Sequence, residues 1–187
     1  MIICYAFCGS FCNFERAFSE LSLLVAKGHD IIPVCSYHFA STDTRFGKSE
    51  VLLSRIESLC GKTVIQTIEE AEPVGPKLHP DVMVISPCTG NTLAKLANGI
   101  TDTAVCMAAK AHLRSDRPLL IALASNDAMS ANLKNISTLL MRKNVYFVPM
   151  LQDDPISKPH SLVADFSLLQ KAFEMSMEGK QMRKLFL

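Results

Sequence analysis

The sequence predicts an α/β protein of three layers, with a doubly wound parallel sheet of Rossmann-like type between two layers of helices. Short apolar runs rich in β-branched residues recur along the chain, longer amphipathic stretches lie between them, and the two kinds alternate. Strands that are covered on both faces are apolar at nearly every residue. Alternation of strands and helices favours right-handed βαβ crossovers and hence a parallel sheet.

The elements follow from these two patterns, taken in chain order. The apolar runs predict strands at Ile2–Phe7, Asp30–Ser36, Asp81–Ser86, Pro118–Ala124 and Val145–Val148. In the first amphipathic stretch Phe14, Phe18 and Leu21 recur at helical spacing. The same pattern predicts helices at Phe14–Ala26, Val51–Leu59, Thr92–Gly99, Thr103–Leu113, Ala128–Arg142 and Ser161–Met177. The proline-rich stretches Pro73–Pro80 and Asp153–Pro159 are expected to be loops within the domain.

Length and composition predict a single domain over residues 1–187. The chain is 49% hydrophobic and 20% charged, which is enough apolar material for a full core. Its formal net charge of +1 gives no reason to expect nucleic acid or a membrane surface as a partner. No apolar run reaches the roughly 18 residues of a membrane span, and the N-terminus lacks the basic region of a signal peptide. A cytoplasmic protein is therefore expected.

The cysteines and histidines do not predict a metal site. None of the seven cysteines forms a CxxC pair, and the five histidines show neither HxxxH nor HExxH spacing. Buried free thiols in a reducing compartment are the expectation.

Ligands of open α/β sheets bind beyond the carboxyl ends of the strands, so the strand–helix junctions are the places to search. The first junction is Phe7-Cys8-Gly9-Ser10. Gly9 permits a tight turn, and Ser10 with a helix N-terminus can bind a phosphate. The turn has neither the GxGxxG nor the GK[ST] pattern, and an ordinary serine helix cap explains it equally well.

The second junction ends at Ser36, and a hydroxyl-rich segment with Arg45 follows it. An arginine among hydroxyls suits a carboxylate or a phosphate, although a solvated loop has the same composition. The third junction, Ser86–Thr92, is the most specific, because a helix cap alone needs one polar residue and this segment has several. Ser125 and Asn126 form the fourth junction and can close the same site.

The third and fourth junctions resemble the flavoprotein family of homo-oligomeric, FMN-containing cysteine decarboxylases. That family reads Pro-x-Ser-Ala-Asn-Thr and then x-x-Lys-x-Ala-x-Gly-x-x-Asp. This chain matches it in register at Pro87, Asn91, Thr92, Lys95, Ala97, Gly99 and Asp102, while Thr89 and Gly90 replace Ser and Ala. Segments that resemble one branch of the family, a subunit of an oxidoreductase, are Thr42–Lys48, Glu70–Pro73, Asp81–Ile85, Gly90–Asn98, Met107–Lys110, Asn144–Pro149 and Gln152–Pro155.

The resemblance implies an FMN site. It assigns the flavin phosphate to Gly9 and Ser10, helped by the Ser36 hydroxyl, with Phe11 standing where smaller residues are usual. It assigns contacts to the flavin ring and phosphate to Pro87, Thr89, Gly90, Asn91 and Thr92, and the substrate side to Ser125 and Asn126. It also implies assembly through trimers with the flavin at a subunit contact.

For the branch, the resemblance implies oxidation of a cyclic dihydro-dicarboxylic precursor to pyridine-2,6-dicarboxylate in the mother cell of a spore-forming bacterium. The chain would work with a second subunit that brings NAD(P), and Arg45 is a candidate for the substrate carboxylate. The catalytic base is not identified.

Two alternative functions stay open. One is decarboxylation of a cysteine-containing substrate, against which stand Pro73 at the family's histidine position and the lack of any cysteine after Cys106. The other is a non-catalytic scaffold for the partner subunit.

Overall fold

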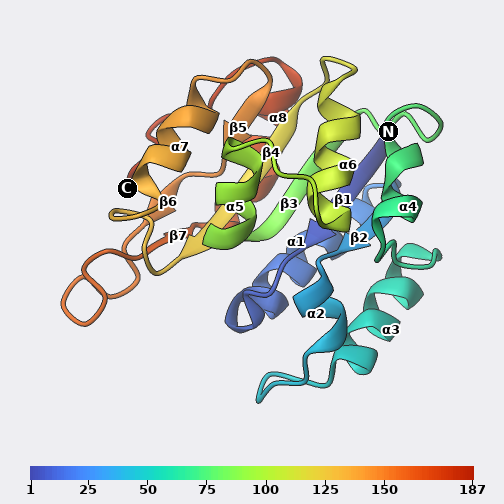
Figure 1. Cartoon of the computed structure of the whole chain (residues 1–187), viewed down its shortest axis with the longest axis horizontal. Helices are drawn as coiled ribbons and strands as arrows, with labels where there is room; N and C mark the ends of the chain where they lie inside the picture. The colour runs from blue at the N-terminus through green and yellow to red at the C-terminus, as the bar shows by residue number, and fades with distance from the viewer.

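The computed structural model describes residues 1–187, and its centre is a mostly parallel sheet (Figure 1). Four parallel strands lie in the order β2-β1-β3-β4. Their bounds are β1 (Ile2–Phe7), β2 (Asp30–Cys35), β3 (Val82–Thr89) and β4 (Leu119–Ser125). The chain leaves β1 on one side to form β2 and crosses to the other side to form β3, so the switch of strand order lies between β1 and β3.

Helices cover both faces of the sheet and make the predicted three layers (Figure 1). One face carries α1 (Phe14–Ala26), α2 (Tyr37–Ser41), α3 (Ser49–Cys60) and α8 (Leu169–Met177). The other carries α4 (Ile68–Ala71), α5 (Gly90–Ala97), α6 (Ala104–Leu113) and α7 (Leu133–Leu140). Three short 3₁₀ helices add η1 (Phe11–Asn13), η2 (Glu72–Val74) and η3 (Phe166–Leu168).

The alternation of side chains along each strand divides the core into two halves. In β1, Ile3, Tyr5 and Phe7 point into the half under α1, α3 and α8, which contains most of the large aromatic side chains. Cys4 and Cys8 point into the other half, where small residues of α6 pack closely. Every residue of β1 from Ile3 onward is fully buried, which explains why the strand shows no polar alternation in sequence.

Two helix predictions were wrong in part. Ser161–Met177 was expected to be one helix, but Leu162–Ala164 forms β7, and α8 begins only at Leu169. β7 lies antiparallel to the end of β4, and β6 (Met150–Leu151) lies antiparallel to β7. Asp165 accepts hydrogen bonds from the Ser167 amide and hydroxyl, so it starts a new helical turn after the strand.

The second partial error concerns Ala128–Arg142, since α7 covers only Leu133–Leu140. Asn126 is followed by turns in which Ser130 and Asn132 donate their amides to the Asp127 carbonyl. The polar side chains of this segment compete with helix formation by bonding locally. The other predicted helices and all five strands are confirmed, with ends that shift by three residues or fewer.

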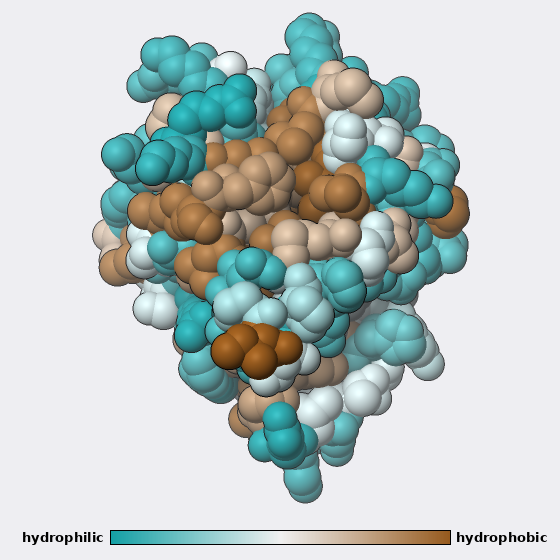
Figure 2. Space-filling view, turned by 90° about the vertical axis from the view of Figure 1, so that its left-hand side faces the viewer, coloured by the Kyte–Doolittle hydropathy of each residue, from teal (hydrophilic) through white to brown (hydrophobic).

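The last residues of the chain return to the edge of the sheet. Met150 donates its amide to the Leu185 carbonyl at 2.8 Å, and its own carbonyl accepts from Leu187 at 2.9 Å. Figure 2 looks onto this side of the molecule, and apolar side chains gather in a band across it. Exposed apolar side chains of the elements nearby are Leu133, Met141, Ile156, Phe186 and Leu187.

β5 (Val145–Phe147) pairs in parallel with the first half of β4, while β7 pairs with the second half.

None of the helices combines the length and the hydrophobicity that crossing a lipid bilayer requires.

Candidate functional site

Two adjoining cavities lie at the carboxyl ends of β1, β2, β3 and β4, with volumes of about 1130 Å³ and about 600 Å³. Gly9, Phe11, Thr89 and Asn91 line both of them. Of the other predicted site residues, Ser10, Gly90, Ser125 and Asn126 line the larger cavity, and Ser36 and Thr92 line the smaller. The structure therefore brings together residues from all four junctions, because parallel strands end at one edge of the sheet.

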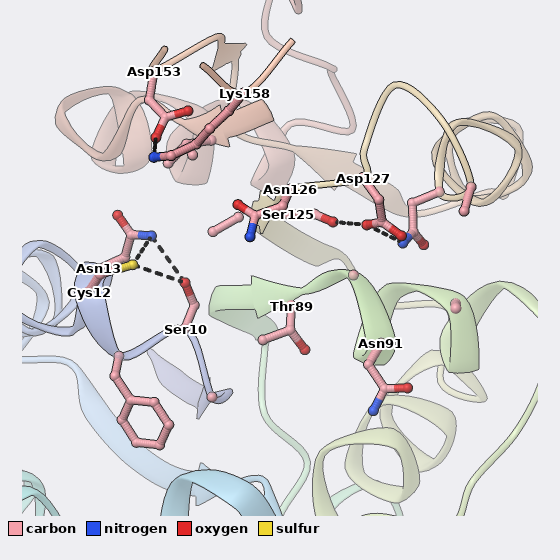
Figure 3. Close-up of a pocket in the computed structure, with 18 of the residues that line it drawn as sticks. Ser10, Cys12, Asn13, Thr89, Asn91, Ser125, Asn126, Asp127, Asp153 and Lys158 are labelled. Carbon is pink, nitrogen blue, oxygen red and sulfur yellow. Dashed lines mark hydrogen bonds and ion pairs between the residues drawn. The ribbon is translucent and has the colours of Figure 1, made fainter. Parts of the chain in front are cut away.

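The loop after β1 presents donors to both cavities. The Gly9 amide donates to no group of the chain. The Ser10 hydroxyl accepts a hydrogen bond from the Asn13 side-chain amide at 3.0 Å and lies 3.9 Å from Cys12 Sγ, a weak partner, so it can still donate its proton to a ligand (Figure 3). Asn13 is 7% exposed and therefore holds the hydroxyl from a fixed position.

Phe11 is an aromatic wall of both cavities. Its ring is stacked on Phe39 of α2 at a centroid distance of 5.7 Å and an interplanar angle of 8°. Phe39 is fully buried and in turn contacts Phe7 and Phe14. The aromatic core thus fixes the Phe11 ring beside the first loop.

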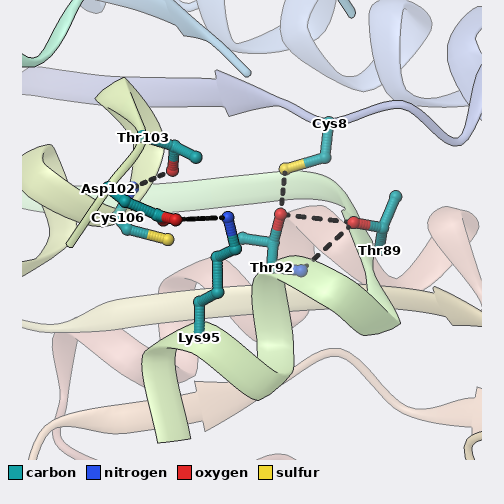
Figure 4. A network of polar contacts seen from close by, with 7 residues as sticks. All are labelled: Cys8, Thr89, Thr92, Lys95, Asp102, Thr103 and Cys106. Carbon is teal, nitrogen blue, oxygen red and sulfur yellow. Dashed lines mark hydrogen bonds and ion pairs between the residues drawn. The ribbon is translucent and has the colours of Figure 1, made fainter. Parts of the chain in front are cut away.

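The end of β3 and the start of α5 form a compact hydroxyl network (Figure 4). Thr89 caps α5 by accepting from the Thr92 amide at 3.3 Å, and it donates its own hydroxyl proton to Thr92 Oγ1 at 3.2 Å. The Thr92 hydroxyl then donates to Cys8 Sγ at 3.3 Å, which ties α5 to the end of β1. Farther along α5, Lys95 pairs with Asp102 at 2.8 Å.

Two further predicted residues act on the backbone around the smaller cavity. Ser36 caps α2 by accepting from the Phe39 amide at 3.4 Å. Pro87 is buried and lines neither cavity, but its carbonyl accepts from the Cys8 amide at 3.1 Å. Pro87 therefore positions the first loop against the end of β3.

A carboxylate stands at the fourth junction that the sequence reasoning did not single out. Asp127 Oδ1 accepts from Ser125 Oγ at 2.5 Å and from Asn132 Nδ2 at 2.8 Å (Figure 3). Asn132 Oδ1 accepts in turn from Asn135 Nδ2 at 2.8 Å. The Ser125 hydroxyl and then the Asn132 amide hold the pKa of Asp127 below its ordinary value. The polar run directly after an apolar strand was the sequence signal for Asp127, whereas nothing in the sequence indicated that Asn132, in the turn before α7, would fold back to it.

Charged side chains complete the rim of the larger cavity. Arg16 of α1 and Lys134 of α7 line it, and neither is in an ion pair with a carboxylate of the chain. Asp153 and Lys158, from the loop between β6 and β7, pair with each other at 3.0 Å. These cations come from three separate elements and show no motif in the sequence.

Arg45 lies apart from the residues that line the cavities. Its side chain is exposed and its guanidinium lies over the Phe46 ring, 4.9 Å from the centroid. Its neighbours Thr44 and Phe46 line the larger cavity, so Arg45 is next to the wall without forming part of it.

The chain matches the Flavoprotein family over residues 18–167. It is 42% identical over 177 residues to the B subunit of dipicolinate synthase from Bacillus subtilis strain 168, an alignment that covers 95% of this chain and 88% of the relative.

Solved structures agree with this assignment. The crystal structure of the dipicolinate synthase B subunit from Bacillus halodurans superposes with a TM-score of 0.91 at 35% identity, over 100% of this chain and 95% of that one. The FMN-dependent cysteine decarboxylase SpaF shares the fold, with a TM-score of 0.68 at 24% identity over 95% of both chains. The chain therefore belongs to the flavoprotein family, among the relatives of the dipicolinate synthase B subunit.

Proposed function

We propose that this chain binds FMN and serves as the B subunit of a dipicolinate synthase. In that role it works with the A subunit of the same enzyme, which brings NAD(P), to oxidise a dihydrodipicolinate-type precursor to dipicolinate (pyridine-2,6-dicarboxylate) during sporulation. The family membership and the two relatives of that name support the assignment. The observation that carries it is the pair of joined cavities. The smaller is rich in hydroxyls, and the larger is lined by Arg16 and Lys134, which form no ion pair.

The smaller cavity fits a phosphate. Its walls bring hydroxyls from Ser36, Thr42 and Thr103 together with the N-terminus of α5, whose first amides have no partner within the helix. A helix N-terminus favours negative charge, and the free Gly9 amide adds a donor. Because Lys95 is already paired with Asp102, the phosphate would be held mainly by neutral donors.

The residues shared by the two cavities fit a flat heterocycle. Phe11 offers the face of its ring, and aromatic faces bind other planar rings at an offset. Asn91 can satisfy polar ring edges, because an amide side chain both donates and accepts. Bound there, FMN would supply a two-electron carrier for hydride.

The larger cavity fits the dicarboxylate substrate. Arg16 and Lys134 supply two positive charges for two carboxylates, and an arginine can bind one of them bidentately. Arg45 remains a candidate as well, because it adjoins Thr44 and Phe46 in the wall. Asn126 is exposed beside the cavity and offers an amide to the same ligand.

Flavin binding is tested by titrating the purified chain with FMN and following flavin fluorescence. We expect binding by the wild type and at least tenfold weaker binding by a Ser10→Ala/Asn91→Ala double variant, since Asn91 lines both cavities and Ser10 directly follows Gly9, which also lines both. Ser115→Ala is the matched control, because Ser115 is exposed beyond the opposite end of α6. A wild-type chain that ignores FMN would contradict the flavin assignment.

The role in catalysis is tested by measuring dipicolinate formation by the A subunit on its own and with either form of this chain. We expect formation with the wild type and a loss of at least tenfold with the double variant. Equal rates with both forms would favour the scaffold alternative. Release of CO₂ from a cysteine-containing substrate would instead favour a decarboxylase.

The proposal includes a homo-oligomer built from trimers in the mother-cell cytoplasm. The band of apolar side chains in Figure 2 supports an interface between copies, since large exposed apolar areas mark association sites. Light scattering on the purified chain is the test, and the mass of a single chain at micromolar concentration would contradict the oligomer.

A further inference from the structure

The carboxylate of Asp127 is held at one oxygen and open at the other. Both hydrogen bonds that it accepts from other residues, those from Ser125 and Asn132, end on Oδ1. No other residue donates to Oδ2, and Asp127 lines the larger cavity. Ser125, Asn132 and Asn135 are 6–8% exposed, so the groups that hold the carboxylate are themselves fixed by burial.

The backbone of α5 makes room for this network. A Cβ at Gly90 would lie 2.5 Å from Ser125 Oγ and 2.6 Å from Asn132 Nδ2. Ala stands at this position in the motif that the chain resembles, so the network occupies the space of the absent methyl group. The absence of a side chain at Gly90 therefore makes room for the buried donors that hold the Asp127 carboxylate.

The surroundings of Asp127 suit a ring with two carboxylates and a nitrogen between them. Arg16 of α1 and Lys134 of α7 supply uncommitted positive charge at the same cavity, and Lys158 of the β6–β7 loop is neutralised by Asp153. A carboxylate among these cations would repel a substrate carboxylate, so it must face a different part of the ligand. The N–H of a dihydropyridine ring is the part that a carboxylate attracts.

We propose that Asp127 is a catalytic residue that accepts the hydrogen bond, and then the proton, of the ring N–H of a dihydropyridine-2,6-dicarboxylate. This inference rests on the proposed function. The ring C–H bond breaks and both of its electrons leave with hydrogen as hydride, to an acceptor of the flavin or nicotinamide class. The remaining ring is a pyridinium, whose N–H bond breaks with its electrons staying on nitrogen, and the proton passes to Asp127 Oδ2. The products are the aromatic dicarboxylate, the reduced acceptor and a protonated Asp127.

Hydride loss makes this transfer feasible for an ordinary carboxylate. A pyridinium flanked by carboxylates is far more acidic than the N–H of the dihydro ring, so a base with a low pKa suffices. The hydrogen bonds from Ser125 and Asn132 keep Asp127 ionised before the reaction and fix its direction.

Binding of two probes separates the ring nitrogen from the carboxylates. Pyridine-2,6-dicarboxylate and benzene-1,3-dicarboxylate carry the same charges, but only the first has a nitrogen. With the product bound, a proton must bridge the nitrogen and Asp127. Calorimetry on the wild-type chain should therefore show that the affinity for pyridine-2,6-dicarboxylate rises about tenfold per pH unit as pH falls from 7.5 to 5.5. The affinity for benzene-1,3-dicarboxylate should not change over this range.

Variants complete the test. Asp127→Asn should bind pyridine-2,6-dicarboxylate with no pH dependence, because its amide donates to the nitrogen, and should lower the kcat measured with the A subunit at least a hundredfold. Asp116→Asn is the matched control, since Asp116 is exposed at the amino end of β4 and pairs with Lys143. Circular dichroism and thermal unfolding establish that each variant is folded, and Asp127→Glu provides a second, charge-conserving variant that should retain the pH dependence.

The outcomes distinguish the two proposals. If neither dicarboxylate binds, the substrate class in the proposed function is wrong. If both bind with the same pH dependence, or if Asp127→Asn retains the wild-type kcat, the role of Asp127 is wrong while the proposed function stands.

Discussion

A methyl group at position 90 would collide with Ser125 Oγ, Asn132 Nδ2 and Asp127 Oδ1, which lie 2.5–3.0 Å from where its carbon would be. Gly90 does not have a positive φ, so its role is close approach and not backbone freedom. At the residue scale the site depends on such fits. The stack of Phe11 on the buried Phe39 ring is another close fit of this kind.

Gly90→Ala should destabilise the chain by about 1–3 kcal/mol, since side chains in a packed region must move to admit the new group. The free energy of unfolding in urea is the measurement, with Ser115→Ala as an exposed control. Unchanged stability would mean that Ser125 and Asn132 move aside without cost and do not form a fixed network.

At the scale of elements, capping decides where helices start. Thr67 accepts from the Glu70 amide at 3.2 Å, and the Glu70 carboxylate accepts from the Thr67 amide at 3.2 Å, so the two form a capping box at α4. Asp165 performs the same task before η3. The Ser161–Met177 pattern reads as one long helix because its apolar spacing continues, but the strand pairing of Leu162 and Val163 with β4 overrides it.

Thr67→Ala should lower the free energy of unfolding by about 1 kcal/mol, the usual cost of a lost N-cap, and Tm by about 2–4 °C. Urea and thermal unfolding measure these changes. Thr67→Ser retains the hydroxyl and should be close to wild type. A loss of equal size in the serine variant would show that the methyl group, and not the cap, stabilises this turn.

At the scale of the whole molecule, titratable groups have pKa values displaced in ways that make stability depend on pH. Hydrogen bonds hold the pKa of Glu15, Asp43, Glu70 and Asp127 below ordinary values. Burial lowers the pKa of His112 and raises that of Cys4 to about 12. A carboxylate with a depressed folded pKa stabilises the fold above its unfolded value, and this stabilisation is lost as pH falls through the folded value.

Stability should therefore be greatest between about pH 7 and 8. It should decline slightly as His112 meets its unfolded pKa near pH 6.5, and more steeply below about pH 5 as carboxylates take up protons. It should decline again above about pH 9, because the thiols buried in the fold ionise only when the chain is unfolded. Urea unfolding from pH 4 to 10 is the measurement, with one cooperative transition expected of the single domain we propose. Greater stability at pH 5 than at pH 7 would contradict this account.

The sequence alone predicted β1 to β5, most helices and the four junctions at which the site lies. Burial of a strand on both faces and the spacing of a helix both show in the apolar pattern of neighbouring residues. Parallel strands bring their carboxyl ends to one edge of the sheet whatever the details of packing. Gly9, Ser10, Thr89 and Asn91 could therefore be predicted as wall residues. The folded structure decided that Asn132, in the turn before α7, folds back onto Asp127, that Arg45 lies outside the cavity wall, and that β6 and β7 extend the sheet. The pairing of β7 with β4 joins segments that are distant in the chain, and the turn that brings Asn132 to Asp127 is local but irregular, so neither leaves a periodic signal in the sequence.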